Sequence, residues 1–298
     1  MKKSVLALAA IISLSSFAKA QENSPLGQLA GRSDIPIAVP AVPLPEKSAP
    51  ARGWDPAAPF SSYQKQAEVI SSDAVSSVIK NVRWGAVPLD GKTYNWETAV
   101  IKPDLLEKVY YGRKTAGAGH SLLVFVFKKG GFLNSRGEAS AALTLGAESY
   151  TREPEGYSRA NDLLGRYPIV WNLTTLANYA DFNINVARSD VLLAPMDIPR
   201  EAGVQLLKAA IARVGLAARG PAQAHNLFSN NCTTNAVALV NTAVPADRRI
   251  DPKTMFATNP DAAFPRRAVA RYTRLGVLSP ETLTLDKTTY RTLEISLY

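Results

Sequence analysis

Residues 120–127, HSLLVFVF, form a nearly continuous apolar run that is rich in β-branched and aromatic side chains. A run of this kind is typical of a strand that is buried on both faces of a sheet. The Gly-Gly pair in the following KKGGFLN predicts a turn, and EASAALTLGAES predicts the strand that returns from it. The pattern therefore predicts a β-hairpin with His120 at its entrance.

Helical spacing dominates the part of the chain after residue 195. Four apolar residues share one helical face: Val204, Leu207, Ile211 and Val214. Pro199 suits the first turn of this helix, which follows the strand-like VLLAP, and Gly220 stops it. A second helix is predicted just after Cys232, with Pro245 as its end, and DAAFPRRAVARYTRL predicts a third before Gly276.

Two segments before the hairpin also have helix-like spacing. The first is YQKQAEVISSDAVSSVIKNV, which RWGAVP closes, and the second is PDLLEKVYYG, with Pro103 near its start. We therefore expect helices in both places. Together with the hairpin, this mixture predicts the α+β fold class.

The first 60 residues follow a different pattern. Two lysines, an apolar stretch from Val5 to Phe17 and Ala18-Lys19-Ala20 are typical of a secretory signal peptide, so we expect residues 1–20 to be cleaved off after Ala20. Residues 21–60 are rich in proline and lack apolar periodicity, which indicates a linker or a surface strap. We therefore expect one domain over residues 61–298, in a soluble protein that is exported to a periplasm.

The charge of the chain suggests which surfaces it meets outside the cytoplasm. The formal net charge is +9, and removal of the three signal-peptide lysines leaves +6. This excess favours peripheral contact with an anionic membrane surface or with cell-wall polymers, although a solvated basic surface without a partner explains it equally well. No basic block is interleaved with aromatic residues, so nucleic acid is not expected. We expect a monomer.

Cys232 is the only cysteine, so the chain cannot form an internal disulfide. An unpaired cysteine in an exported protein is either a reactive thiol, half of an intermolecular bridge or a buried inert residue. At a helix N-terminus, the helix dipole and free N–H groups favour the thiolate and can bind an oxyanion. We name Asn231, Thr233 and Gly119 as candidates for this oxyanion or substrate site.

A thiol nucleophile needs a base, and the chain has only His120 and His225. We prefer His120, because a base at the edge of a rigid strand can face a nucleophile on a helix. A group that orients this histidine is expected on the returning strand, where the candidates are Ser140, Thr144 and Glu148. No metal is expected, because the cysteine and histidines lack close ligand spacing, and no cofactor is expected either.

Two motifs, GHSLLVFVF and NNCTTNAVALV, resemble those of the Lnb-type N-terminal periplasmic domain. VLLAPMDIPREAGVQLLKAAIARV and IDPKTMF are similar as well, so the resemblance covers about Leu105 to Met255. This family resembles circularly permuted NlpC-type, papain-like thiol enzymes, in which the histidine strand precedes the cysteine helix. Lecithin:retinol acyltransferase-like enzymes have the same order.

The resemblance implies a permuted papain-like core, with Cys232 as nucleophile and His120 as base. The antiparallel sheet would carry the histidine, and a helix would carry the cysteine at its N-terminus. Members of the family often have an aromatic residue where this chain has His225, so His225 is interpreted as a pocket or packing residue.

Three functions remain open from the sequence. The first is a thiol acyltransferase or hydrolase that acts on envelope lipid, lipoprotein or cell-wall substrates through an acyl-enzyme. The second is a cell-wall peptidase or amidase, and the third is an envelope binding protein with a degenerate site. The lipoprotein N-acyltransferases of the family carry further membrane segments, so acyl transfer between lipids and lipoproteins is an analogy here.

Overall fold

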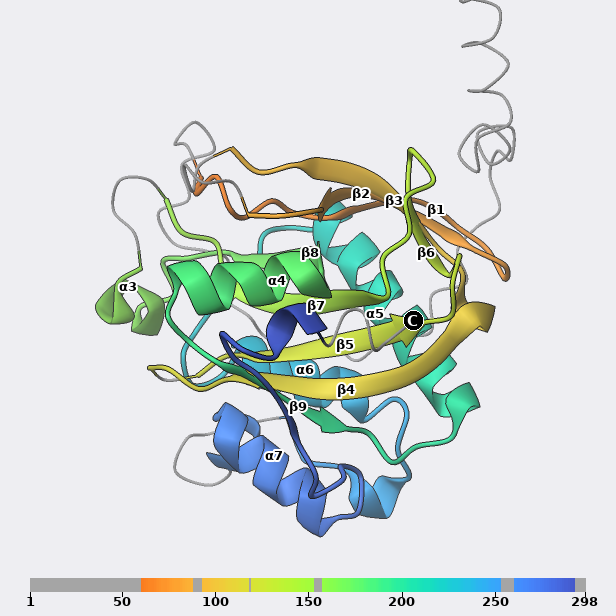
Figure 1. Ribbon diagram of the computed structural model, residues 1–298. Helices are drawn as coiled ribbons and strands as arrows, with labels where there is room; N and C mark the ends of the chain where they lie inside the picture. The colour runs from red at the N-terminus through yellow and green to blue at the C-terminus, as the bar shows by residue number, and fades with distance from the viewer. Residues whose placement is uncertain (1–59, 88–92, 118, 153–156, 253–259, 293–298) are drawn as a thin grey trace, which may run out of the picture.

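The structure, a computed structural model, describes residues 60–87, 93–117, 119–152, 157–252 and 260–292 (Figure 1). The predicted signal peptide and residues 21–59 lie outside this range, so the cleavage site and the linker or strap stay predictions. The same holds for the proposed division into one domain over residues 61–298.

The described residues contain ten strands and several helices. The strands are β1 (Glu68–Ser72), β2 (Ser77–Arg83), β3 (Trp96–Ile101), β4 (Leu106–Lys114), β5 (Ser121–Phe127), β6 (Phe132–Asn134), β7 (Ala142–Ser149), β8 (Ile169–Thr175), β9 (Val191–Pro195) and β10 (Leu283–Leu285). The longer helical segments are α3 (Arg159–Leu163), α4 (Leu176–Asp181), the π-helix η2 (Phe182–Val186), α5 (Arg200–Arg219), α6 (Cys232–Val240) and α7 (Pro265–Arg274). Short 3₁₀ turns are η1 (Pro103–Leu105), η3 (Ala246–Arg248) and η4 (Pro260–Ala262).

All ten strands join one sheet in the order β10-β9-β4-β5-β7-β8-β2-β3-β6, with β1 paired to β2. Every pair is antiparallel except β2 and β8. The predicted hairpin is confirmed: β5 is buried throughout and pairs with β7, with Leu123 opposite Leu145. The short β6 lies in the connection and pairs with β3 instead.

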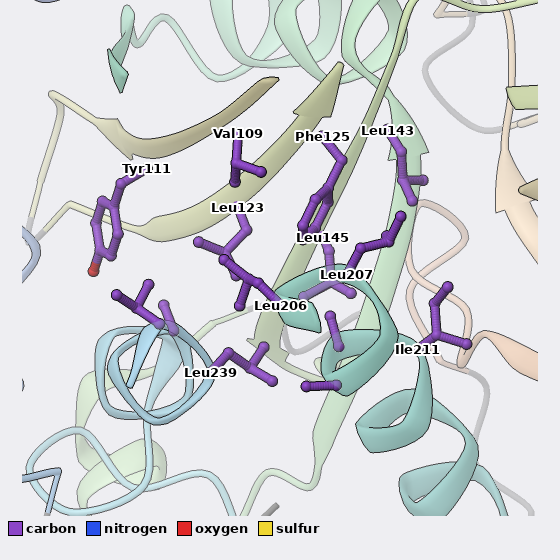
Figure 2. Packing of buried hydrophobic residues seen from close by; sticks show 14 of the residues in the cluster. Val109, Tyr111, Leu123, Phe125, Leu143, Leu145, Leu206, Leu207, Ile211 and Leu239 are labelled. Carbon is purple, nitrogen blue, oxygen red and sulfur yellow. The ribbon is translucent and has the colours of Figure 1, made fainter. Parts of the chain in front are cut away.

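Helices cover the two faces of the sheet, as Figure 1 shows for α4 on one side and for α5 and α6 on the other. On the α5 and α6 face, Leu123, Phe125 and Leu145 of the hairpin pack with Leu206 of α5 and Leu239 of α6 (Figure 2). The opposite face packs its own smaller cluster against α4. The alternating side chains of β5 supply both cores, which explains its nearly continuous apolar sequence.

The three predicted helices after residue 195 are confirmed as α5, α6 and α7. The two earlier helix predictions are wrong. Residues 63–82 include strands β1 and β2, which turn at Asp73, where its carboxylate accepts hydrogen bonds from two backbone N–H groups. Residues 103–112 are the short turn η1 followed by β4. Both segments contain β-branched and aromatic residues, which favour strands. Pairing into the large sheet stabilises these segments more than a helix with the same apolar spacing would.

The described residues therefore form a mixed α/β fold with one large, mainly antiparallel sheet. None of the helices in this part of the chain has both the length and the hydropathy that a bilayer crossing requires.

Candidate active site

Cys232 is the first residue of α6, and a polar network holds the helix start in place. The Asn231 side chain accepts hydrogen bonds from the backbone N–H groups of Thr233 and Thr234, at 2.8 Å and 3.0 Å. The Thr234 hydroxyl accepts one in return from the Asn231 N–H, which completes a capping box. The asparagine-rich sequence before the helix thus fixes the position of the cysteine.

Strand β5 contacts the same helix start. The backbone N–H of Ser121 lies 3.5 Å from the Cys232 sulfur and donates a hydrogen bond to it. The Ser121 hydroxyl is 3.0 Å from the Thr233 hydroxyl and accepts a hydrogen bond from Tyr111 at 2.8 Å. These contacts connect β4, β5 and the first turn of α6 next to the thiol.

His120 immediately precedes β5, and its ring lies close enough to the Cys232 side chain for each group to shift the pKa of the other. The structure therefore brings together the two residues that the sequence paired. His120 lies over Gly146 of β7, where a Cβ atom would come within 2.9 Å of its Nε2. Glycine at this position leaves the space that the imidazole occupies.

The two side chains alter each other's protonation. Burial alone would raise the pKa of the Cys232 thiol, but the charge of His120, its hydrogen bond and the Ser121 N–H lower that pKa from 9.0 to about 7. Burial acts to lower the pKa of His120, yet the nearby thiolate raises it overall. The pair therefore favours a thiolate beside an imidazolium near neutral pH.

The three candidates for the orienting residue differ in position. Glu148 lies near His120, with 3.6 Å between its Oε1 and the histidine Nε2. Thr144 instead hydrogen-bonds with Thr174 at 2.6 Å, and Ser140 lines a separate cleft of about 400 Å³. Of the three, only Glu148 is placed to orient the imidazole.

The sequence reasoning missed Asn172 of β8, which pairs with Gly146 of β7. Paired residues of adjacent strands project from the same face of a sheet, so Asn172 belongs to the His120 side. Its side chain is buried, and its Oδ1 has no hydrogen-bond partner among the described residues. No sequence feature pointed to Asn172, because the strand that carries it, β8, was not predicted.

The three candidates for the oxyanion site already form hydrogen bonds within the protein. Thr233 donates its N–H to the Asn231 side chain, and Asn231 uses its amide nitrogen on the carbonyls of Leu227 and Ala263. Gly119 adopts φ +80° and donates its N–H to Ala116, so it serves the turn before β5. Among the described residues, the N–H of Cys232 itself remains without a partner and can serve an oxyanion.

Cys232 and His120 line a cleft of about 590 Å³, which His225 also lines. His225 is buried, and its Nδ1 lies 2.5 Å from Oδ1 of the fully buried Asp162. Tyr157 donates to the other oxygen of Asp162 at 2.7 Å. His225 thus ties the loop before α6 to helix α3 and contributes the weakest of the five influences on the Cys232 pKa.

Comparisons with known proteins place the chain in a family. The profile described as the Lnb N-terminal periplasmic domain matches residues 92–258, more than half of the chain. This match includes both His120 and Cys232 and confirms the resemblance seen in the sequence. No curated protein and no solved structure matches the chain. The chain therefore belongs to the Lnb N-terminal periplasmic domain family.

Proposed function

We propose that this protein is a periplasmic thiol enzyme that forms an acyl-enzyme on Cys232, with His120 as its base. The observation that carries the proposal is the Cys232–His120 pair at a helix N-terminus, where the histidine and the Ser121 N–H lower the pKa of the thiol to about 7. A buried inert cysteine has no need of a charged partner, and burial without one raises its pKa. The order of the two residues also agrees with a permuted papain-like core.

The reaction requires two proton transfers through His120. The Cys232 thiolate attacks a carbonyl carbon, a C–S bond forms, and the Cys232 N–H stabilises the oxyanion. His120 then donates its proton to the leaving oxygen or nitrogen, whose bond to the carbonyl carbon breaks to leave a thioester. An incoming hydroxyl, amine or water gives its proton to His120 and attacks, and the thiolate leaves.

Glu148 acts as the positioning residue in this scheme. Its carboxylate faces the Nε2 of His120, and Gln64 holds it through a 2.8 Å hydrogen bond to the other carboxylate oxygen. A fixed negative charge on that side stabilises the imidazolium and orients the ring. No cofactor enters this chemistry.

The residues that line the cleft indicate which class of substrate it can bind. Leu227, Phe264 and Pro265 supply apolar side chains to its lining; Leu227 lies in the loop before α6, and Phe264 and Pro265 lie at the N-terminus of α7. Such a stretch suits an acyl chain, and the net positive charge suits an anionic envelope surface. We therefore propose envelope lipids, lipoproteins or cell-wall components as substrates. The charged and amide groups in the remaining lining favour a peptide or amide substrate as the second candidate.

The test is to treat the purified protein with an activated acyl ester and to locate the adduct by mass spectrometry. We expect a thioester on Cys232, absent in Cys232→Ser. His120→Asn should slow its formation about 100-fold or more, the usual contribution of a positioned acid or base. The double variant should be little worse than either single one, because the two residues act as a unit.

His225 provides the comparison within the same cleft. His225→Gln should slow adduct formation far less than His120→Asn when rates are compared per folded molecule. A chain in which His225 is essential and His120 is dispensable would show that the wrong base was chosen. Absence of any adduct on Cys232 in the folded wild-type protein would contradict the enzyme proposal and favour a binding protein.

A further inference from the structure

The buried polar atoms that lack partners are gathered in one place. Among the described residues, four buried side-chain atoms have no hydrogen-bond partner: His120 Nε2, Asn172 Oδ1, Tyr179 OH and Asn183 Oδ1. All four residues line the cleft of Cys232. Unpartnered buried polar atoms are rare in folded proteins, because each one destabilises the fold. Their convergence on one cleft indicates a site for a polar ligand group.

Three of these residues come from β8, α4 and η2, which all contribute to the lining of the cleft. Asn172 comes from β8, whereas Tyr179 and Asn183 come from α4 and from the π-helix that continues it. Tyr179 and Asn183 are linked through a 2.8 Å hydrogen bond from the Asn183 amide nitrogen to the Tyr179 carbonyl. Neither side-chain oxygen has a hydrogen-bond partner among the described residues. A π-helix turn at such a place is common at functional sites.

Arg83 supplies a cation to the same region. Its guanidinium is buried, donates to Asn178 Oδ1 and to the Tyr63 carbonyl at 2.6 Å each, and lies 5.2 Å from the ring centre of Phe182. Within the described residues, no carboxylate forms a direct ion pair with it. Glu148 is close enough to favour its charge but makes no direct contact.

The combination of charges limits what the ligand can be. An ammonium group would meet the cations Arg83 and Lys114, both of which line the cleft, together with protonated His120. An anion would meet the unpartnered amide oxygens of Asn172 and Asn183 and the carboxylate of Glu148. A neutral hydroxyl avoids both conflicts, because it donates to the amide oxygens and accepts from Tyr179 or Arg83.

The walls of the region also suit a polyhydroxyl compound. Tyr63 and Phe182 line it with rings that stack on each other, 5.3 Å between their centres. Burial keeps the Tyr179 hydroxyl protonated, since it raises the pKa of that group well above 10.0, so the hydroxyl can donate. Aromatic faces beside amide groups give both apolar contact and directed hydrogen bonds.

We propose that the region bounded by Arg83, Asn172, Tyr179 and Asn183 is a subsite for a neutral polyhydroxyl group, either a sugar ring or a glycerol unit. This inference rests on the proposed function, because it assigns to that enzyme a substrate with hydroxyl groups next to the bond that Cys232 attacks. The subsite itself is a binding site and can be tested without any reaction.

The test is saturation-transfer difference NMR on the folded protein without its signal peptide, with methyl β-glucopyranoside, glycerol, ethanolamine and inorganic phosphate as separate probes. We expect saturation of the glucoside or of glycerol, and the stronger of the two identifies the source of the hydroxyls. Asn172→Leu should weaken binding about tenfold or more, as expected for a lost hydrogen bond to a bound hydroxyl. Tyr179→Phe should also weaken it.

Asn185→Ala is the matched control, because Asn185 lies on the same π-helix but is exposed and bonds to Asp181 and Tyr290. It should leave binding unchanged. Asn172→Leu should not lower the melting temperature, because it removes a buried polar atom that has no partner to lose.

Several results would overturn the subsite. They are saturation of ethanolamine or phosphate in preference to the polyols, no saturation at all, or binding that Asn172→Leu and Tyr179→Phe both leave intact. The outcome is separate from that of the enzyme proposal. A Cys232 adduct without polyol binding rejects only the subsite, whereas polyol binding without an adduct rejects only the acyl-enzyme.

Discussion

At the scale of single residues, Cys232 and His120 stabilise each other's charged forms. Burial opposes a thiolate, so the lowered pKa of Cys232 depends on the imidazolium and on the Ser121 N–H. The thiolate in turn raises the pKa of His120 against the effect of burial. Because each charge is favourable only beside the other, removal of either residue changes the protonation of the one that remains.

Alkylation of Cys232 as a function of pH measures this dependence. In the wild-type protein the reactive thiolate should prevail above about pH 7, since the pKa is lowered to about 7. His120→Asn removes the two largest lowering influences and keeps burial, so the midpoint should rise above the ordinary value of about 8.5. His225→Gln should move it much less. A midpoint that is the same in His120→Asn and the wild type would show that the histidine does not control the thiol.

At the scale of secondary structure elements, the pair depends on three elements that meet at one point. Helix α6 presents the thiol at its capped first turn. Strand β5 follows His120 directly and contacts the thiol through the Ser121 N–H, and β7 leaves room for the imidazole at Gly146. A side chain on β7 at that position would occupy the space of the ring. The glycine is therefore as important to the geometry as Cys232 and His120 themselves.

Gly146→Ala tests this arrangement of strands. Its Cβ would lie 2.9 Å from His120 Nε2, so the imidazole must move away. We expect the rate of acyl-adduct formation to fall about tenfold or more, because small displacements of a catalytic group are costly. The melting temperature should change little, since the displaced atoms belong to a side chain that lines a cleft.

Gly215→Ala is a suitable control for this substitution. Gly215 lies on α5, where an added Cβ meets only ordinary contacts of 3.4 Å or more, so the rate should remain at the wild-type level. Equal rates for the wild type and Gly146→Ala would mean that the position of the His120 ring above β7 is not required.

At the scale of the whole molecule, residues 60–67 connect the start of the described chain to the site. Phe60 stacks on Tyr150, with 3.6 Å between ring centres. Gln64 is buried and donates to Glu148 and to the Ser149 carbonyl, while its Oε1 accepts from the Thr151 N–H. The segment thus supports the strand end that carries the proposed positioning carboxylate.

Two shortened proteins distinguish this segment from the residues before it. A protein that begins at residue 60 should unfold at nearly the same temperature as a protein that begins at Gln21, after the predicted signal peptide, and should form the acyl adduct equally fast. A protein that begins at Glu68 should be less stable and slower, because it loses the Gln64–Glu148 hydrogen bond. Thermal unfolding and the adduct rate measure both effects. Failure of the first protein to fold would show that the proline-rich segment is a structural strap.

Those parts of the fold that depend on local pattern could be predicted from the amino-acid sequence. The apolar run of β5, the glycine turn after it and the strand β7 were recognisable from burial and turn signals, and so were the three later helices. The pairing of Cys232 with His120 also followed, because a lone thiol at a predicted helix start needs a base and only two were available.

Tertiary structure decided everything that depends on which strands become neighbours. Residues 63–82 and 103–112 had helical spacing but became strands, because the large sheet offered them partners. The choice of Glu148 over Thr144 as the residue that faces His120, and the presence of Asn172 beside Gly146, depend on strand register. The alternation of side chains within one strand gives the face of each residue, but it does not tell which residue of a neighbouring strand lies opposite. For that reason the proximity of Cys232 and His120 could be predicted from the sequence, whereas the groups around them could not.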